Sequence, residues 1–181
     1  MTAIPSPSAE PAPAATPLQA LVILPIVLAL VGVFIALSTA LGSSEFYAGF
    51  FFLFYWAAVQ HADFHELPPS ALGAFFGVAL GWAMQLLVAK LGTAQGSLAF
   101  LALILPVLYC LMIGRLRLIV NNSAMLLLTA AGISHVQARA SFQGMFINLA
   151  LAVAFFGGAM WAVQWLRTRG AARQAQAAPS L

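Results

Sequence analysis

The chain has 181 residues, of which 63% are hydrophobic and 6% are charged, and its mean hydropathy is +1.00. Soluble domains carry about 25% charged residues, so this composition excludes a water-soluble globule and predicts an integral membrane protein. The apolar stretches are continuous and lack the alternating polarity of an outer-membrane β-barrel. We therefore expect an all-α, polytopic transmembrane helix bundle in contact with the lipid bilayer.

The same composition excludes three further classes of protein. Cys110 is the only cysteine, so a disulfide scaffold is excluded. The seven Lys and Arg residues are scattered and form no basic stripe, which argues against a nucleic-acid partner. No nucleophile is paired with a base at a useful spacing, and no glycine-rich phosphate loop occurs. We therefore predict no enzyme activity, no catalytic residues, no cofactor and no metal.

In chain order, residues 1–17 form a Pro/Ala-rich tail that is expected to be disordered. A transmembrane domain over residues 18–166 follows, and residues 167–181 form a basic C-terminal tail. A helix needs about 20 apolar residues to span the bilayer. Charged or polar residues divide the transmembrane domain into six apolar segments: 18–41, 46–60, 71–89, 93–114, 118–134 and 142–166. We expect about six spans, and residues 46–62 either cross fully or are re-entrant.

Positive charges predict the orientation, because cytoplasmic loops carry the excess of Lys and Arg. With six spans, five positive residues share a side with both termini, and Lys90 and Arg139 lie on the other side. Both termini are therefore predicted to be cytoplasmic. If residues 46–62 were re-entrant, the N-terminus would move to the outside. The five residues are Arg115, Arg117, Arg167, Arg169 and Arg173.

Small residues recur at helical spacing in two of the segments. Gly73, Gly77 and Gly81 form one strip, and Ala150, Ala154 and Gly158 form the other. Such strips let helix backbones approach closely in lipid. The strips predict that these two helices cross closely within the chain, with a homodimer contact or a pore lining as alternatives.

The densest cluster of ionisable residues is formed by His61, Asp63, His65 and Glu66. If the second helix continues through this cluster, His61 and His65 share a face, a spacing compatible with a transition metal. Histidine also titrates near neutral pH, so the cluster is a candidate proton-responsive loop. The simplest interpretation is a solvated corner before Pro68 and Pro69, which suit the start of the next helix.

A few polar or amphipathic residues are candidates for a path through the bilayer. Asn121 and Asn148 lie within apolar segments, and buried amides usually hydrogen-bond between helices. The alternative is that Asn121 and Asn148 line a polar path across the bilayer. In that hypothesis Trp82 and His61 line the same path. If the four residues converge, transport is favoured. If they face separate partners or lipid, a non-transporting role is favoured.

Three aromatic motifs carry a family resemblance: Tyr47-Ala48-Gly49-Phe50, Tyr55-Trp56-Ala57 and Gly81-Trp82-Ala83-Met84. Over about residues 45–162 the chain resembles the YcdZ-like family of small bacterial inner-membrane proteins of unknown function. A weaker likeness, through residues 55–58 and 73–81, is to fusaric-acid-resistance-type exporter modules. Neither family implies a substrate, but the resemblance implies a location in the bacterial inner membrane.

These patterns together predict a small-molecule transporter or channel-like permease whose substrate is unknown. Six short helices make a thin wall around a path, so we expect a homo-oligomer. The alternative is a membrane accessory or assembly protein that transports nothing.

Overall fold

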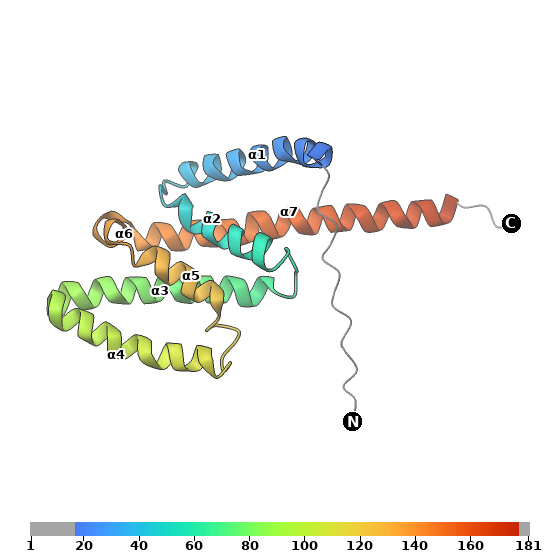
Figure 1. Ribbon diagram of the computed structural model, residues 1–181. Helices are drawn as coiled ribbons and strands as arrows, with labels where there is room; N and C mark the ends of the chain where they lie inside the picture. Colours follow the sequence, from blue (N-terminus) through green and yellow to red (C-terminus); the bar gives the residue numbers. More distant parts are fainter. Residues whose placement is uncertain (1–16, 178–181) are drawn as a thin grey trace, which may run out of the picture.

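The apolar segments of the sequence fold into helices, and Gly, Pro and charged residues separate them. The computed structural model describes residues 17–177, and all regular structure in that range is helical (Figure 1). The elements are α1 (Pro17–Ala40), α2 (Phe46–Phe54), the π-helical segment η1 (Tyr55–Val59), α3 (Leu67–Leu91), α4 (Thr93–Met112), α5 (Asn122–Ala131), α6 (Ser134–Arg139) and α7 (Phe142–Ala177). The predicted all-α class is confirmed.

Six apolar helices correspond to the six predicted segments, but their lengths differ. Within the described residues, three are long and apolar enough to cross a membrane: Leu67–Leu91, Thr93–Met112 and Phe142–Leu166. The shorter ones are Leu24–Ala40, Phe46–Val59 and Asn122–Ala131. The protein is thus a multi-pass membrane protein with three candidate spans.

One predicted helix boundary was wrong. The segment predicted over residues 118–134 contains only the ten-residue α5, because residues 113–121 form turns before Asn121 caps the helix. The last apolar segment ends at residue 166 as predicted, and its helix continues beyond the apolar part to Ala177, into the predicted basic tail. Of the predicted N-terminal tail only Pro17 is described, as the first residue of α1, and residues 178–181 also lie outside the described range.

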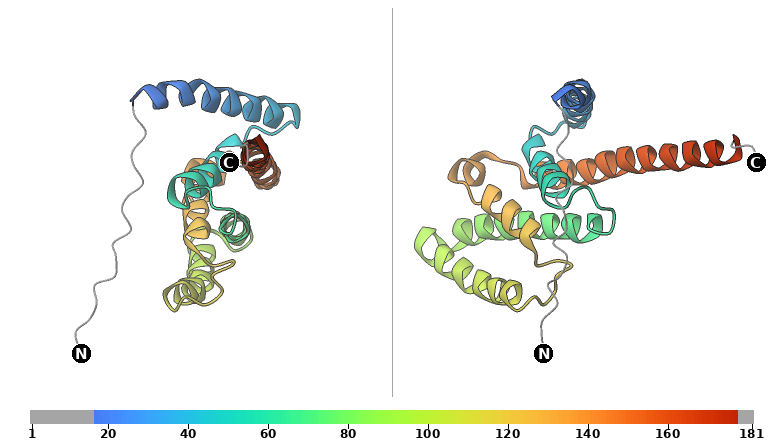
Figure 2. Two further views of the ribbon diagram at one scale, coloured as in Figure 1. Left: turned by 90° about the vertical axis from the view of Figure 1, so that its right-hand side faces the viewer. Right: turned by 45° about the vertical axis from the view of Figure 1, so that its right-hand side comes forward.

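The centre of the bundle is built from α2, α3, α5 and α7. From α2 to α5, and again at α7, consecutive apolar helices run in opposite directions (Figure 1). The helices α1 and α4 lie at opposite edges, and α1 crosses the bundle obliquely (Figure 2). Fully buried side chains at the centre include Trp56, Leu127, Met145 and Leu149. The face of α4 is mostly exposed, as expected for a helix that meets lipid.

The glycine strip on α3 packs against α5 and not against the small residues of α7. A Cβ atom at Gly73, Gly77 or Gly81 would come within 3.0 Å of Asn121, Ala124 or Ala131 respectively, all in or beside α5. The close crossing predicted for α3 was therefore correct, but its partner was wrong.

The second predicted strip forms no close contact. Ala150, Ala154 and Gly158 are exposed, and a Cβ added at Gly158 meets nothing within 4 Å. The buried face of α7 is instead formed by Met145, Asn148, Leu149, Ala152 and Phe156. The apolar sequence of α7 gave no signal to distinguish these two faces.

Candidate functional site

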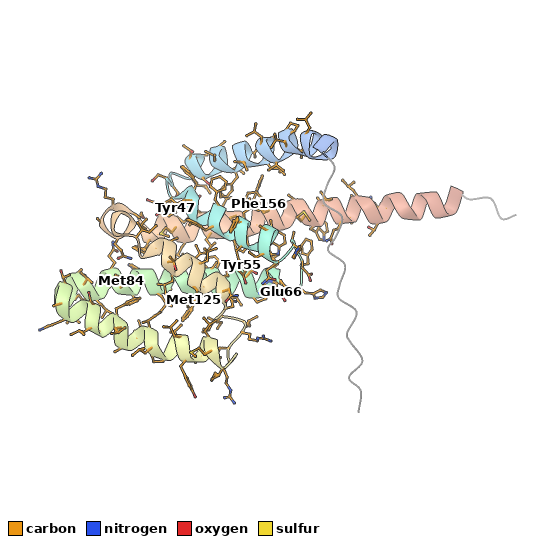
Figure 3. The ribbon with its side chains drawn as sticks, viewed as in Figure 1. Tyr47, Tyr55, Glu66, Met84, Met125 and Phe156 are labelled. Atoms are coloured by element: carbon orange, nitrogen blue, oxygen red, sulfur yellow. The ribbon has the colours of Figure 1, made fainter. Side chains whose placement is uncertain are left out.

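A polar cavity of about 680 Å³ opens at one end of the bundle. Four elements form it: the end of η1, the start of α3, the end of α4 and the start of α5, together with the turns between α4 and α5. Figure 3 shows Tyr55 and Glu66 at this end and Tyr47 toward the opposite end. Its polar lining residues are Tyr55, Gln60, Glu66, Ser70, Arg117, Asn121 and Asn122.

Asn121 fixes the wall of the cavity where α5 meets α3. Its side-chain oxygen accepts a hydrogen bond from the Ala124 amide at 3.2 Å and so caps α5. Its side-chain nitrogen donates to the Pro69 carbonyl at 2.7 Å and to the Arg117 carbonyl at 3.1 Å. The residue therefore ties α5, α3 and the preceding turns together.

Ser70 is the most deeply buried polar residue of the lining. It is 2% exposed, and its backbone carbonyl accepts a hydrogen bond from the Ser123 hydroxyl at 2.8 Å. Its own hydroxyl is buried and has no hydrogen-bond partner among the described residues. A buried polar group left without a partner costs about 1–3 kcal/mol, so Ser70 adds an unsatisfied hydroxyl to the wall of the cavity.

The cavity combines charges of both signs with neutral polar groups. Glu66 and Arg117 supply one acidic and one basic side chain, while Asn121 and Asn122 supply amides. The Gln60 amide donates to the Tyr55 hydroxyl at 2.9 Å, which holds both side chains at the rim. Such a lining suits a small solute that carries both donors and acceptors and little net charge.

A second polar cluster lies at the other end of the bundle, where α2 and α7 begin. The Ser43 hydroxyl donates to the Gly144 carbonyl at 3.1 Å, and the Asn148 side-chain nitrogen donates to Ser43 and to Gly144. The Glu45 carboxylate accepts a hydrogen bond from the Ser141 amide at 3.2 Å. We call these five residues the closed cluster, because Ser43, Gly144 and Asn148 are all buried.

The closed cluster is polar but not fully satisfied. The side-chain oxygen of Asn148 is buried without a hydrogen-bond partner within residues 17–177. Asn148 itself is 0% exposed. Buried polar groups without a hydrogen-bond partner are rare in native structures. The end at which α2 and α7 begin therefore contains a hydrogen-bonding group that the packing of the helices leaves unsatisfied.

The ionisable cluster at His61 forms a corner and not a helical turn. His61 and Ala62 have φ values of 53° and 55°, a left-handed conformation that ends the preceding helix. The hypothesis that His61 and His65 share one helix face was therefore wrong. Within the part of the chain that the structure describes, no three His, Cys, Asp or Glu residues come together in a group that could hold a metal ion.

Hydrogen bonds define that corner. The Asp63 carboxylate accepts from the His65 amide at 2.9 Å, and the Asp63 carbonyl accepts from the Trp56 indole at 2.8 Å. The corner leads Glu66 into the cavity lining at the start of α3. A proton-responsive role for His61, Asp63, His65 and Glu66 stays a prediction.

The four residues of the hypothetical polar path do not converge. Asn121 lines the cavity, whereas Asn148 belongs to the closed cluster at the opposite end. His61 is exposed at the corner. Trp82 is 46% exposed and packs its edge against Phe146. The structure thus gives no continuous path through these four residues, and Asn121 alone belongs to the cavity.

Sequence reasoning found two of the cavity residues, Glu66 and Asn121, but assigned them to different features. It missed Ser70, because a serine at the start of an apolar helix is an ordinary residue. It also used Arg117 only as a topology signal. The contact between α3 and the residues before α5 could not be predicted from local spacing, because the hydrogen-bonded residues Pro69 and Asn121 are 52 positions apart in the sequence.

Comparison with known proteins gives no relative on which an assignment could rest. No family model matches the chain, and neither a characterised protein nor a solved structure matches it.

Proposed function

We propose that the protein is a small-molecule transporter or channel-like permease of the bacterial inner membrane. The observation that carries the proposal is the polar cavity at one end of a largely apolar helix bundle, lined by one acidic, one basic and several amide and hydroxyl side chains. Its volume of about 680 Å³ is within the usual range of ligand pockets, about 300–1,000 Å³.

The lining favours a small polar solute with little net charge. Glu66 and Arg117 can pair with opposite ends of a dipolar molecule, and the amides of Gln60 and Asn121 can hydrogen-bond to its neutral groups. A strongly anionic or cationic solute would leave one of the two charged side chains opposed by a like charge. Amino acids and small amides are therefore the first substrates to test.

The positive residues support an opening toward the cytoplasm. Arg115 and Arg117 belong to the turns beside the cavity, and Lys90 and Arg139 belong to the other side of the alternating helices. In this proposal both termini are cytoplasmic, and the six apolar helices all cross or enter the bilayer. Association into a homo-oligomer is part of the proposal, because α1 and α4 leave broad apolar faces uncovered.

Thermal unfolding of the purified protein in detergent tests ligand binding directly. The probes are glycine, acetamide, ethylammonium and benzoate, and a ligand present at about 100 times its dissociation constant stabilises the protein by about 2.7 kcal/mol. We expect stabilisation by glycine or acetamide that is lost in Glu66→Gln and Arg117→Gln. The control Lys90→Gln removes an exposed charge outside the cavity and should keep the response.

Flux into proteoliposomes then separates transport from binding. Uptake of the stabilising probe that is saturable and lost in the same two variants would support the proposal. A well-folded protein that responds to none of the four probes, and takes none of them up, would overturn it.

One set of observations favours the alternative, a membrane accessory protein that transports nothing. Asn148, His61 and Trp82 have separate surroundings, and Asn148 is bound within the closed cluster. Buried polar groups that only join helices are common in membrane proteins. In that case the protein should co-purify with a stoichiometric partner from its native membrane, and cavity variants should leave that association unchanged.

A further inference from the structure

The helices on either side of the α3–α4 hairpin follow the same plan. In each half a long apolar helix is followed by a short helix, a corner and a second long helix: α1, α2 with η1, and α3, then α4, α5 with α6, and α7. The last helices of the two halves begin at Leu67 and Phe142, which are 75 positions apart.

The same spacing relates the buried positions of the two halves. Adding 75 to each buried residue of α2 and η1 gives the buried residues of α5, in order and without exception. These residues are Ala48, Gly49, Phe52, Tyr55 and Trp56 in the first half, and Ser123, Ala124, Leu127, Ala130 and Ala131 in the second. Gly73 and Gly77 correspond in the same way to Asn148 and Ala152, all of them buried.

Equivalent pairs of helices also make the contacts between the two halves. The short helix α5 packs against α3 of the other half, and the short helix α2 packs against α7 of the other half. Each crossing is joined near its start by a side chain that donates to a backbone carbonyl: Asn121 to Pro69 and Ser43 to Gly144. Pro69 and Gly144 are again 75 positions apart.

The two halves have opposite orientation. In Figure 1, α3 and α7 run in opposite directions, as do α2 and α5. The halves are therefore related as an inverted repeat, with a pseudo-two-fold axis across the bundle. In transporters such repeats lie about an axis in the membrane plane, and one half moves against the other to open each side in turn.

The two equivalent ends differ in one respect. At the end where α3 and α5 begin, the crossing borders the open cavity. At the end where α7 and α2 begin, the side chains of Ser43, Asn148 and Glu45 hydrogen-bond within the closed cluster, and Ser43, Gly144 and Asn148 are buried. The closed end nevertheless retains one buried, unpartnered polar atom among the described residues, the Asn148 side-chain oxygen.

We infer that the closed cluster is the second entrance of the protein, which opens to the same small polar solute when the cavity end closes. The two halves exchange conformations, so that the end at which α2 and α7 begin opens while the end at which α3 and α5 begin closes. This inference rests on the proposed transport function, since it names the device by which the solute leaves the cavity on the opposite side.

A reversible cross-link across the closed cluster tests the inference. In a Cys110→Ala background, Ser43→Cys with Gly144→Cys places two thiols together, because a Cβ atom at Gly144 would lie 2.9 Å from the Ser43 hydroxyl oxygen. Oxidation should stop flux of glycine or acetamide into proteoliposomes while leaving their binding to the cavity intact. Reduction should restore the flux.

A second measurement needs neither a known solute nor a cross-link. Asn122→Cys in the same background reports on the cavity end through its rate of modification by a maleimide, since Asn122 is exposed and lines the cavity. Gly144→Phe wedges the closed cluster apart and should lower that rate several-fold. Gly158→Phe adds the same side chain to an exposed face of α7 and should leave the rate unchanged.

The outcomes separate the two ideas. Flux that continues through the cross-linked protein would overturn the second entrance but leave a transporter. An unchanged modification rate in a folded Gly144→Phe protein would also overturn it, because the ends would be uncoupled. Absence of flux in the protein without a cross-link would count against the proposed function, and the modification rates would still decide whether the two ends are coupled.

Discussion

The close packing of α5 on α3 predicts a large difference between two Gly→Ala variants. A Cβ atom at Gly77 would lie within 3.0 Å of the Ala124 backbone carbonyl, which cannot move without displacing α5. A Cβ atom at Gly158 meets nothing within 4 Å. Overpacking of this kind costs about 1–3 kcal/mol. Gly→Ala also favours a helix by about 1 kcal/mol, and that gain is shared by both variants.

The comparison of the two variants therefore isolates the packing cost. We expect Gly77→Ala to be less stable than Gly158→Ala by about 1–3 kcal/mol. For a chain of this size each kcal/mol shifts the Tm by about 2–4 °C, so the difference in Tm should be about 2–12 °C. Thermal unfolding of the purified variants in one detergent, followed by tryptophan fluorescence, measures it. Equal Tm values would refute the packing of α3 on α5 through its glycine strip.

Three further variants test the local geometry of the cavity and its corner. Asn121→Ala should destabilise the protein by about 1–2 kcal/mol, because it removes the α5 cap and the bond to Pro69, and thermal unfolding would reveal it. Ser123→Ala should cost about 0.5–1.5 kcal/mol by removing its buried hydrogen bond to the Ser70 carbonyl, and a Tm equal to that of the parent would contradict this. Ala62→Gly should stabilise the protein by up to about 1 kcal/mol, because its φ of 55° suits glycine, and a lower Tm would show that its packing outweighs that strain.

The class of the protein and the positions of its helices could be predicted from the sequence, because a charge inside the bilayer is costly and therefore marks helix ends. The two short helices could not be predicted with the same accuracy. The segment 118–134 is mostly apolar, yet Asn121 caps a helix inside it, and the residues before the cap form turns. Hydropathy averages over such a segment and does not detect a cap. Only the contact of Asn121 with Pro69, on another helix, fixes where α5 begins.

The candidate site depended on contacts that sequence spacing does not encode. Glu66 stood out because it is one of few acidic residues, whereas Ser70 gained its importance from burial beside Ser123. The predicted path through Trp82 and Asn148 assumed that polar and aromatic residues in an apolar chain face one interior. In this bundle Asn148 instead joins α7 to the residues before α2, and Trp82 lies on an outer face. Polarity indicates that a residue has a partner, but it does not say which one.

The inverted repeat is hidden in the sequence for a steric reason. At the spacing of 75 positions the two halves share only a few aliphatic residues. Where one half has Gly73 and Gly77 the other has Asn148 and Ala152, and where one has Trp56 the other has Ala131. In this arrangement a short helix of one half packs against a long helix of the other half. The side chains that fill the crossing of α5 with α3 therefore need not be the same types as those that fill the crossing of α2 with α7. Three glycines on α3 let α5 approach closely, whereas aromatic rings fill much of the space among α1, α2 and α7, as Phe34 does beside Phe156. The pattern of burial is preserved because the backbone plan is the same, while the residue types diverge because the packing is shared differently between the halves.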